Sequence, residues 1–313
     1  MSYGINASPV VVRNLCCKQH VPMAVAAFTA MRKLSESAVR FIIHDDGSLD
    51  WRDEQVILAS VPDARIVRRQ EADESVSDIL AKYPLLLRAR KDIAYFIKLL
   101  DILLIEPTPT TCYLDSDVLF LRPFSHLADL RAHGTRALFM ADVQNAYGFR
   151  LPDFWPIGEL RFARKLNSGL FAVSTGDVEI EYFDWILRKC GLEQARQHTG
   201  WFEQGAWAAL GRRLGVKLFE SEQIRLVTEP ETLIEGPVGM HFTGRSRQRF
   251  KEFAERVQER REGEDIVCER LRSSLAGEYT ALGALCASVS GRVSRWLGRK
   301  IARPGRSEDS CLR

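Results

Sequence analysis

The sequence predicts an α/β fold in which helices flank an open, mainly parallel sheet. Short apolar runs alternate with longer segments of helical periodicity, and Asp-rich turns follow two of the runs. The 313 residues, 46% hydrophobic and 27% charged, also have the composition of an ordinary globular chain. Ligands of such sheets bind beyond the carboxyl ends of the strands, where both turns are expected to lie.

The first half of the chain supplies three expected strands and two expected helices. Three adjacent β-branched residues make Val10–Val12 the first strand. Apolar residues recur at helical spacing over Pro22–Leu34, and a proline suits the first turn of a helix. Phe41–Ile43 is the second strand, Val56–Val61 closes the second helix, and Arg65–Val67 is the third strand.

The following segment continues the alternation. An amphipathic helix is expected over Asp92–Leu104, ahead of short strands at Cys112–Leu114 and Val118–Leu121. Later strands are expected at Ala137–Ala141 and Gly169–Val173. Between these two, residues 144–165 are rich in proline, glycine and aromatic residues. Structureless stretches of this length are uncommon, so we expect a functional loop or lid there.

Charge and cysteine content narrow the class of protein. The net charge of +3 gives no reason to expect a nucleic-acid partner. Residues 241–313 carry 16 basic and 10 acidic side chains, a net of +6, so the preceding 240 residues have a net of −3. Seven cysteines without a C-x-x-C pair favour free thiols in the cytoplasm. Met1–Arg13 lacks the pattern of a signal peptide, and no apolar run reaches the ~18 residues of a membrane span.

The sharpest local signal is the pair of carboxylates in Asp115-Ser116-Asp117. An apolar strand delivers both acids, one residue apart, to a strand end, where both can reach one hard divalent cation that neutralises a diphosphate. A third ligand is available from His241. Gly244 follows it and permits close backbone approach, and Arg247 suits a phosphate.

These motifs together resemble the nucleotide-sugar glycosyltransferases of family eight, the group that contains glycogenin and the bacterial lipooligosaccharide galactosyltransferases. The matching blocks occur in the family's order between residues 98 and 247, which is about half of the chain. They are Lys98, 17 residues before the first acid; Tyr113-Leu114-Asp115-Ser116-Asp117-Val118-Leu119; Ala141-Asp142; Asn167-Ser168-Gly169-Leu170-Phe171; Glu203-Gln204-Gly205; and His241-Phe242 with Gly244-Arg245.

The resemblance implies a GT-A fold, which is Rossmann-like, and a transfer that retains the anomeric configuration. It implies that Asp115, Asp117 and His241 hold Mn²⁺ or Mg²⁺ against the diphosphate of a nucleotide sugar, expected to be a UDP-sugar. The acceptor would be a saccharide, a lipid-linked glycan or a protein. The resemblance also implies that Lys98 and Asp142 contact the sugar or its phosphate. It further implies that Gly244 and Arg247 contact the donor phosphates, and that Asn167, Glu203 and Gln204 contact the sugar.

Three features depart from the family pattern. Glu203 stands where the family has aspartate, and it is the nearest candidate for a covalent nucleophile. Arg247 replaces the family's lysine and is not followed by Pro-Trp. The turn His44–Ser48 resembles instead the D-D-G-S turn of family-two glycosyltransferases, which implies that Asp45 and Asp46 contact the nucleotide.

The C-terminal part is expected to be a separate tail. We assign residues 1–265 to one catalytic domain and residues 266–313 to a helix with a basic, disordered end. Leu275–Leu297 has apolar residues at three- and four-residue steps, and arginines fall to one side of them. Such a helix either lies on an anionic membrane, which would place the protein peripherally on its cytoplasmic face, or packs on the domain.

Two other functional classes fit part of the sequence. Haloacid-dehalogenase-type phosphatases also use an apolar-D-x-D motif, with the first acid, here Asp115, as nucleophile. That motif normally opens their domain, whereas more than 110 residues precede it here. The other class is a catalytically degenerate GT-A domain that binds a glycan or a membrane. Individual residues also have ordinary structural explanations, Lys98 as a solvated helix residue and Asn167 as a turn residue.

Overall fold

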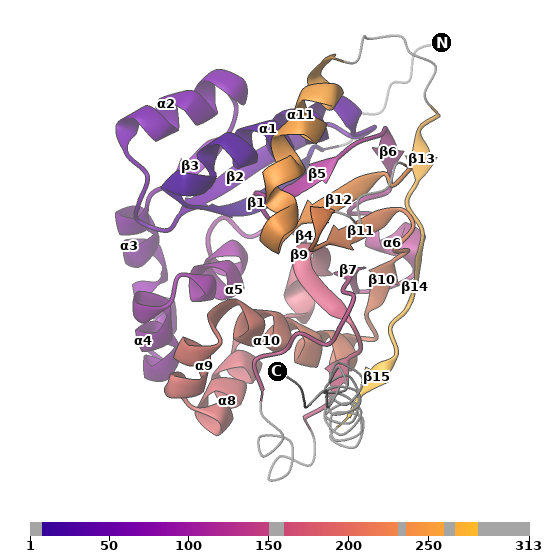
Figure 1. The fold of residues 1–313 in the computed structure, drawn as a ribbon. Coiled ribbons are helices and arrows are strands. Elements are labelled where there is room, and N and C mark those ends of the chain that lie inside the picture. Colours follow the sequence, from indigo (N-terminus) through magenta and orange to yellow (C-terminus); the bar gives the residue numbers. More distant parts are fainter. Residues whose placement is uncertain (1–7, 150–159, 231–235, 260–266, 281–313) are drawn as a thin grey trace, which may run out of the picture.

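The fold is built on one central sheet of eight strands (Figure 1). The structure is a computed structural model that describes residues 8–149, 160–230, 236–259 and 267–280. Six strands share one direction, and the first and fourth strands of the spatial order below run against them. The predicted α/β fold with a mainly parallel sheet is therefore confirmed. The spatial order is β14 (Ser273–Leu275), β10 (Lys217–Phe219), β7 (Ala137–Ala141), β9 (Leu166–Ser174), β4 (Thr110–Leu114), β1 (Val10–Cys16), β2 (Val39–Asp45) and β3 (Arg65–Val67).

Helices cover both faces of this sheet (Figure 1). One face carries α3 to α5 and α8 to α10, whose apolar side chains share one core with the strands. The other face carries α1, α2 and α11, which belong to a second core. The bounds are α1 Val21–Leu34, α2 Trp51–Ser60, α3 Arg69–Leu80, α4 Pro84–Asp92, α5 Tyr95–Leu104, α6 Leu130–His133, α8 Ile180–Cys190, α9 Leu192–Gln197, α10 Thr199–Leu214 and α11 Phe250–Glu259.

The strands divide their side chains between the two cores by simple alternation. In β2, Ile42 packs into the core under α5, while Phe41 and Ile43 pack into the core under α1. In β7, Phe139 and Leu138 likewise belong to opposite cores. Successive residues of a strand point to opposite faces, so a strand buried on both sides is an unbroken apolar run. This is why the strands were recognisable as short apolar runs.

Three smaller sheets surround the central one. β12 (Gly239–Phe242) lies between β11 (Ile224–Val227), which is parallel to it, and β5 (Val118–Phe120), which is antiparallel. β6 (Phe124–Ser125) pairs with β13 (Glu269–Arg270), and β8 (Phe162–Ala163) pairs with β15 (Glu278–Tyr279). In the β12–β5 pair, His241 stands opposite Val118. This register brings His241 beside the acidic turn, although 124 positions of the sequence separate it from Asp117.

The expected helix over Asp92–Leu104 is shorter than predicted. Asp92 is the last residue of α4, and α5 begins only at Tyr95. Between the two helices the backbone of Ile93 is extended, with φ −135° and ψ 110°. The apolar periodicity crosses this break because residues on both sides of it face the same core.

The tail prediction is wrong at its first two positions. Leu275 lies in β14, which pairs with β10 at the edge of the central sheet, and Tyr279 lies in β15. β10 and β8 have backbone N–H and C=O groups free to pair at their edges, and the segments that contain Leu275 and Tyr279 form strands on those edges instead of a helix. The remaining positions of the predicted helix, together with the basic end, lie outside the described residues, and the division at residue 265 remains a prediction. Within the described part, no helix has the length and apolar character needed to span a bilayer.

A buried ion pair joins α4 and α5, and its loss is expected to be costly. Arg90 binds both carboxylate oxygens of Asp101, at 2.6 and 2.7 Å, and both side chains are almost fully buried. Arg90→Met leaves Asp101 as an uncompensated buried charge, so the free energy of unfolding should fall by about 3–5 kcal/mol. Arg88→Met on the same helix is the control, because Arg88 is 66% exposed. Urea unfolding measures both variants, and a loss below about 1 kcal/mol for Arg90→Met would contradict the prediction.

Candidate metal centre and active site

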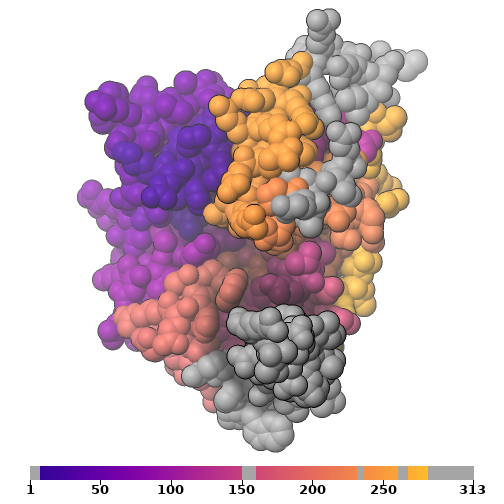
Figure 2. Space-filling model, viewed as in Figure 1, coloured from indigo at the N-terminus to yellow at the C-terminus, as the bar shows by residue number. Residues whose placement is uncertain are grey.

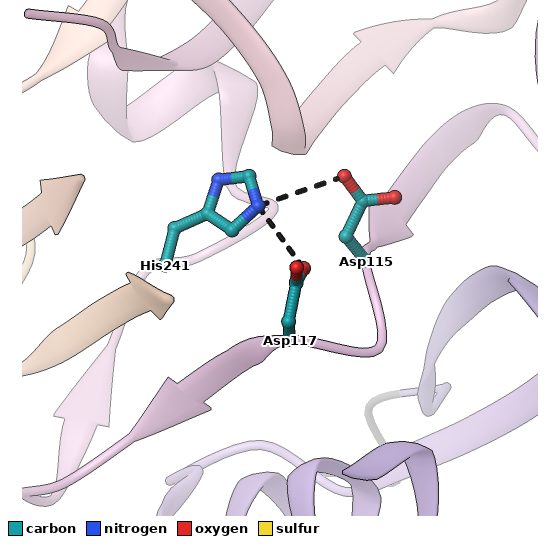
Figure 3. Close-up of side chains that lie close together, drawn as sticks. All are labelled: Asp115, Asp117 and His241. Carbon is teal, nitrogen blue, oxygen red and sulfur yellow. Dashed lines mark ion pairs between the residues drawn. The ribbon is translucent and has the colours of Figure 1, made fainter. Parts of the chain in front are cut away.

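Three potential metal ligands meet at the carboxyl end of β4 (Figure 3). Asp115 and Asp117 belong to the turn between β4 and β5, and His241 comes from β12. Nε2 of His241 is 3.0 Å from Oδ1 of Asp117 and 3.9 Å from Oδ2 of Asp115. One ligand atom from each residue lies within 4.8 Å of the others. Two carboxylates and an imidazole suit Mn²⁺, and their convergence fits the predicted ligand set.

A cation holds each of the two carboxylates. Nζ of Lys98, on α5, is 3.2 Å from both oxygens of Asp115 and 3.5 Å from Oε2 of Glu203. Arg247 donates from Nε and Nη2 to Oδ2 of Asp117, at 2.8 and 2.6 Å. Lys98 is buried, so it is not the solvated helix residue that the alternative explanation required. The site therefore concentrates cations as well as acids.

The pKa values at the site follow from this pairing. Burial by itself raises the pKa of Asp117, but His241 and Arg247 outweigh it and hold that pKa well below its usual value. Burial by itself lowers the pKa of His241, and Asp117 reverses this, so the pKa of His241 is raised. Lys98 behaves in the same way: burial opposes its charge, and Asp115 and Glu203 raise its pKa.

Glu203, on α10, is the unusual carboxyl of the site. Its Oε2 accepts a hydrogen bond from Oγ of Ser168 at 2.9 Å, whereas its Oε1 has no hydrogen-bond partner among the described residues. Burial raises the pKa of Glu203 to about 7, although Lys98 acts in the opposite direction. A carboxyl that changes charge near neutral pH, inside a cavity, is typical of functional sites.

Three further predicted residues form one hydrogen-bonded group. Oδ2 of Asp142 accepts from Nδ2 of Asn167 at 2.9 Å and from Nε2 of Gln204 at 3.2 Å. Oδ1 of Asp142 accepts from the backbone N–H of Gln144 at 3.0 Å. Asn167 also touches Nδ1 of His241, at 3.2 Å. The group thus links the end of β7 to the metal ligands.

All these side chains line one cavity of about 520 Å³, which opens as a hollow between the orange α11 and the coral helices in Figure 2. The predicted site residues that line it are Asp46, Lys98, Asp115, Asp117, Asp142, Asn167, Glu203, Gln204, His241, Gly244 and Arg247. Asp45 does not line it. Its carboxylate instead accepts hydrogen bonds from the backbone N–H groups of Gly47 and Leu49, and so it shapes the turn after β2.

Several cavity residues had no assigned role in the sequence analysis. The hydroxyl of Tyr113 donates to Oδ1 of Asp115 at 2.8 Å, and the Lys98 ammonium lies 4.6 Å from the centre of its ring. Tyr113 precedes Asp115 by two residues, and alternate residues of a strand share a face, so the contact between these two side chains could have been predicted from the sequence. Tyr95 and Trp201, also in the lining, are 42% and 58% exposed. Nothing in the local sequence distinguishes these two from ordinary surface aromatics.

No protein-family model matches the chain, and no curated protein sequence matches it. Solved structures with a similar course of the chain include three glycosyltransferases. The galactosyltransferase LgtC, in complex with donor and acceptor sugar analogues, is 14% identical over 81% of this chain and 98% of its own, with a TM-score of 0.47. Mouse xyloside xylosyltransferase 1 is 10% identical over 75% of this chain and 98% of its own, with a TM-score of 0.48.

The third is core-mannan synthase A from Aspergillus fumigatus in its Mn/GDP form. It is 8% identical over 67% of this chain and 71% of its own, with a TM-score of 0.43. Likeness of this degree assigns neither a family nor a function to this chain. The function of the chain therefore has to be inferred from the residues of the site itself.

Proposed function

We propose that the protein is a metal-dependent glycosyltransferase of GT-A type that moves a sugar from a nucleotide sugar, expected to be a UDP-sugar, to a saccharide acceptor with retention of configuration. The observation that carries the proposal is the convergence of Asp115, Asp117 and His241 in one cavity. Lys98 and Arg247 stand beside them as further cations. Such a group suits a ligand with several negative charges, as a nucleoside diphosphate has.

Different residues of the cavity are expected to bind the metal, the phosphates and the sugar. A divalent cation held by Asp115, Asp117 and His241 would supply positive charge that stabilises the departing diphosphate. The Arg247 side chain is 44% exposed, so it can turn from Asp117 towards the phosphates when the donor binds. Asp142 and Gln204 offer fixed hydrogen-bonding groups for sugar hydroxyls, and Glu203 lines the same cavity.

The rim of the cavity favours a saccharide as acceptor. Tyr95, Val143 and Trp201 line the cavity and are 42%, 56% and 58% exposed. Exposed apolar groups gathered at a cavity mark a binding surface, and the C–H face of a sugar ring packs well on an aromatic ring. The aromatic rim thus lies next to the polar group that would hold the donor.

The proposal is tested by measuring donor binding directly. A panel of nucleotide sugars is titrated into the full chain by calorimetry, with Mn²⁺ and with EDTA. We expect one nucleotide class to bind with Mn²⁺ and to lose its affinity in EDTA, and proton NMR of the product should show the retained anomeric configuration. Binding of no donor under either condition would refute the proposal. Transient phosphorylation of Asp115 by a phosphate ester would support the phosphatase alternative instead.

Replacing Trp201 should weaken binding of the acceptor without changing binding of the donor. Trp201→Ala removes the larger exposed ring of the rim, so the KM for a saccharide acceptor should rise about tenfold, the equivalent of ~1.4 kcal/mol. The donor Kd should stay unchanged. Trp51→Ala is the matched control, because Trp51 is 67% exposed and does not line the cavity. Equal acceptor KM values for the two variants would contradict the assignment of the rim.

A further inference from the structure

We propose that Asn167 is a positioning residue that keeps a proton on Nδ1 of His241, so that Nε2 is the nitrogen left to ligate a cation between Asp115 and Asp117. Asp142 in turn holds Asn167. The inference deepens the proposed function, because it concerns how the chain prepares its metal ligand before any sugar binds. It assigns Asn167 a task different from the sugar contact that the sequence resemblance implies.

The orientation of the Asn167 amide is fixed by its two other partners. The backbone N–H of Gly169 lies 2.9 Å from Oδ1 of Asn167, and Oδ2 of Asp142 lies 2.9 Å from its Nδ2. A backbone N–H can only donate, and an ionised carboxylate can only accept. Oδ1 must therefore be the amide oxygen, and a flipped amide would oppose donor to donor and acceptor to acceptor.

The orientation of Asn167 then decides which nitrogen of His241 carries the proton. Nδ1 of His241 is 3.2 Å from Oδ1 of Asn167, so Nδ1 has to donate to that oxygen. Nε2 faces the carboxylate of Asp117, which can only accept, so a protonated Nε2 donates to it. A cation held by Asp115 and Asp117 would take the place of that proton, and Nδ1 would keep its own. Nε2 is also the atom that lies 3.0 Å from Asp117 and 3.9 Å from Asp115. A hydrogen bond on the far nitrogen is the usual way in which proteins orient a ligating imidazole.

Packing prevents the ring from turning away. A Cβ atom on Gly169 would lie 2.4 Å from Cε1 and 2.6 Å from Nδ1 of His241, so the ring rests directly on the backbone there. Asp142, Asn167 and His241 are each less than 8% exposed. Asp142 is itself fixed by hydrogen bonds from Gln144 and Gln204. The series Asp142–Asn167–His241 is therefore buried and braced at each member.

The protonation of His241 is read in the protein labelled with ¹⁵N-histidine and saturated with Zn²⁺, a diamagnetic substitute for Mn²⁺. We expect His241 to carry a proton on Nδ1 and none on Nε2. Asn167→Leu removes the acceptor, so the Nδ1 proton should exchange faster with solvent. His241→Gln identifies the signal among the six histidines. A wild-type His241 protonated on Nε2 overturns the inference, whether or not the proposed function is right.

Metal affinity supplies the second readout. The full chain is titrated with Mn²⁺ alone, and Asn167→Leu should weaken the Kd about 10- to 100-fold. Asn145→Leu is the control, because Asn145 accepts only from the backbone of Lys165 among the described contacts. The double variant Asp142→Asn/Asn167→Asp reverses the polarity of the pair but keeps an acceptor on Nδ1, so it should recover most of the affinity. Wild-type affinity in a folded Asn167→Leu protein overturns the inference.

Discussion

Replacing Asp117 by asparagine is expected to abolish Mn²⁺-dependent donor binding and to lower sugar transfer by more than about a thousandfold. The carboxylate joins His241 on one oxygen and Arg247 on the other, so its charge organises the whole centre. A metal supplies several kcal/mol of charge stabilisation in such a reaction, and ~4 kcal/mol corresponds to about a thousandfold in rate. Calorimetry with the donor, and initial rates of transfer, measure the two losses.

The same variant should stay folded, which separates loss of function from loss of structure. Asparagine has the shape of aspartate, and the half-exposed Arg247 can turn to solvent. Asp63→Asn is the control, because Asp63 forms an exposed ion pair with Arg32 and neither residue lines the cavity. Both variants should unfold cooperatively, Asp63→Asn near the wild-type temperature and Asp117→Asn below it, because Asp117→Asn loses a carboxylate whose lowered pKa stabilises the fold. A donor Kd in Mn²⁺ equal to the wild-type value for Asp117→Asn would remove the basis of the metal assignment.

Much of the fold was predictable because its strands are buried on both faces. Runs such as Phe41–Ile43 and Ala137–Ala141 are continuous and apolar, so they stand out in the sequence. The break at Ile93 was missed because its neighbours on both sides face the same core. Leu275 was misassigned because its partner strand, β10, is distant in the sequence. The periodicity of apolar residues indicates which side chains are buried, whereas pairing between segments that are distant in the sequence leaves no local pattern.

The candidate site likewise has residues that the sequence predicts and contacts that it does not. The two acids were predictable because they follow one strand, and His241 because a motif surrounds it. The contacts between elements could not be predicted from the sequence. Arg247 binds Asp117, Lys98 lies between Asp115 and Glu203, and Asn167 contacts His241. Each of these contacts joins elements that only the register of β12 against β5, or the packing of α5 and α10, brings together.

Glu203→Gln is expected to remove a pH dependence from the stability of the protein. Burial raises the pKa of Glu203 to about 7 from an ordinary value of 4.5. Between these two values the folded protein holds the proton and the unfolded chain releases it, so stability falls as the pH rises through that window. One pKa unit is worth ~1.4 kcal/mol, so the complete effect is about 3 kcal/mol. Glutamine stays neutral, and the variant should gain that much relative to the wild type between pH 4.5 and pH 8.

Urea unfolding at a series of pH values measures this difference, and Glu54→Gln provides a comparison of opposite sign. The hydrogen bond from Arg68 lowers the pKa of Glu54, so that carboxylate stabilises the fold above its unfolded pKa and the contribution disappears as the pH falls. Removing Glu54 should therefore cost stability at neutral pH, whereas removing the charge of Glu203 should add it. If the two variants give parallel pH profiles, the carboxyl of Glu203 is ionised throughout, and burial does not control its charge.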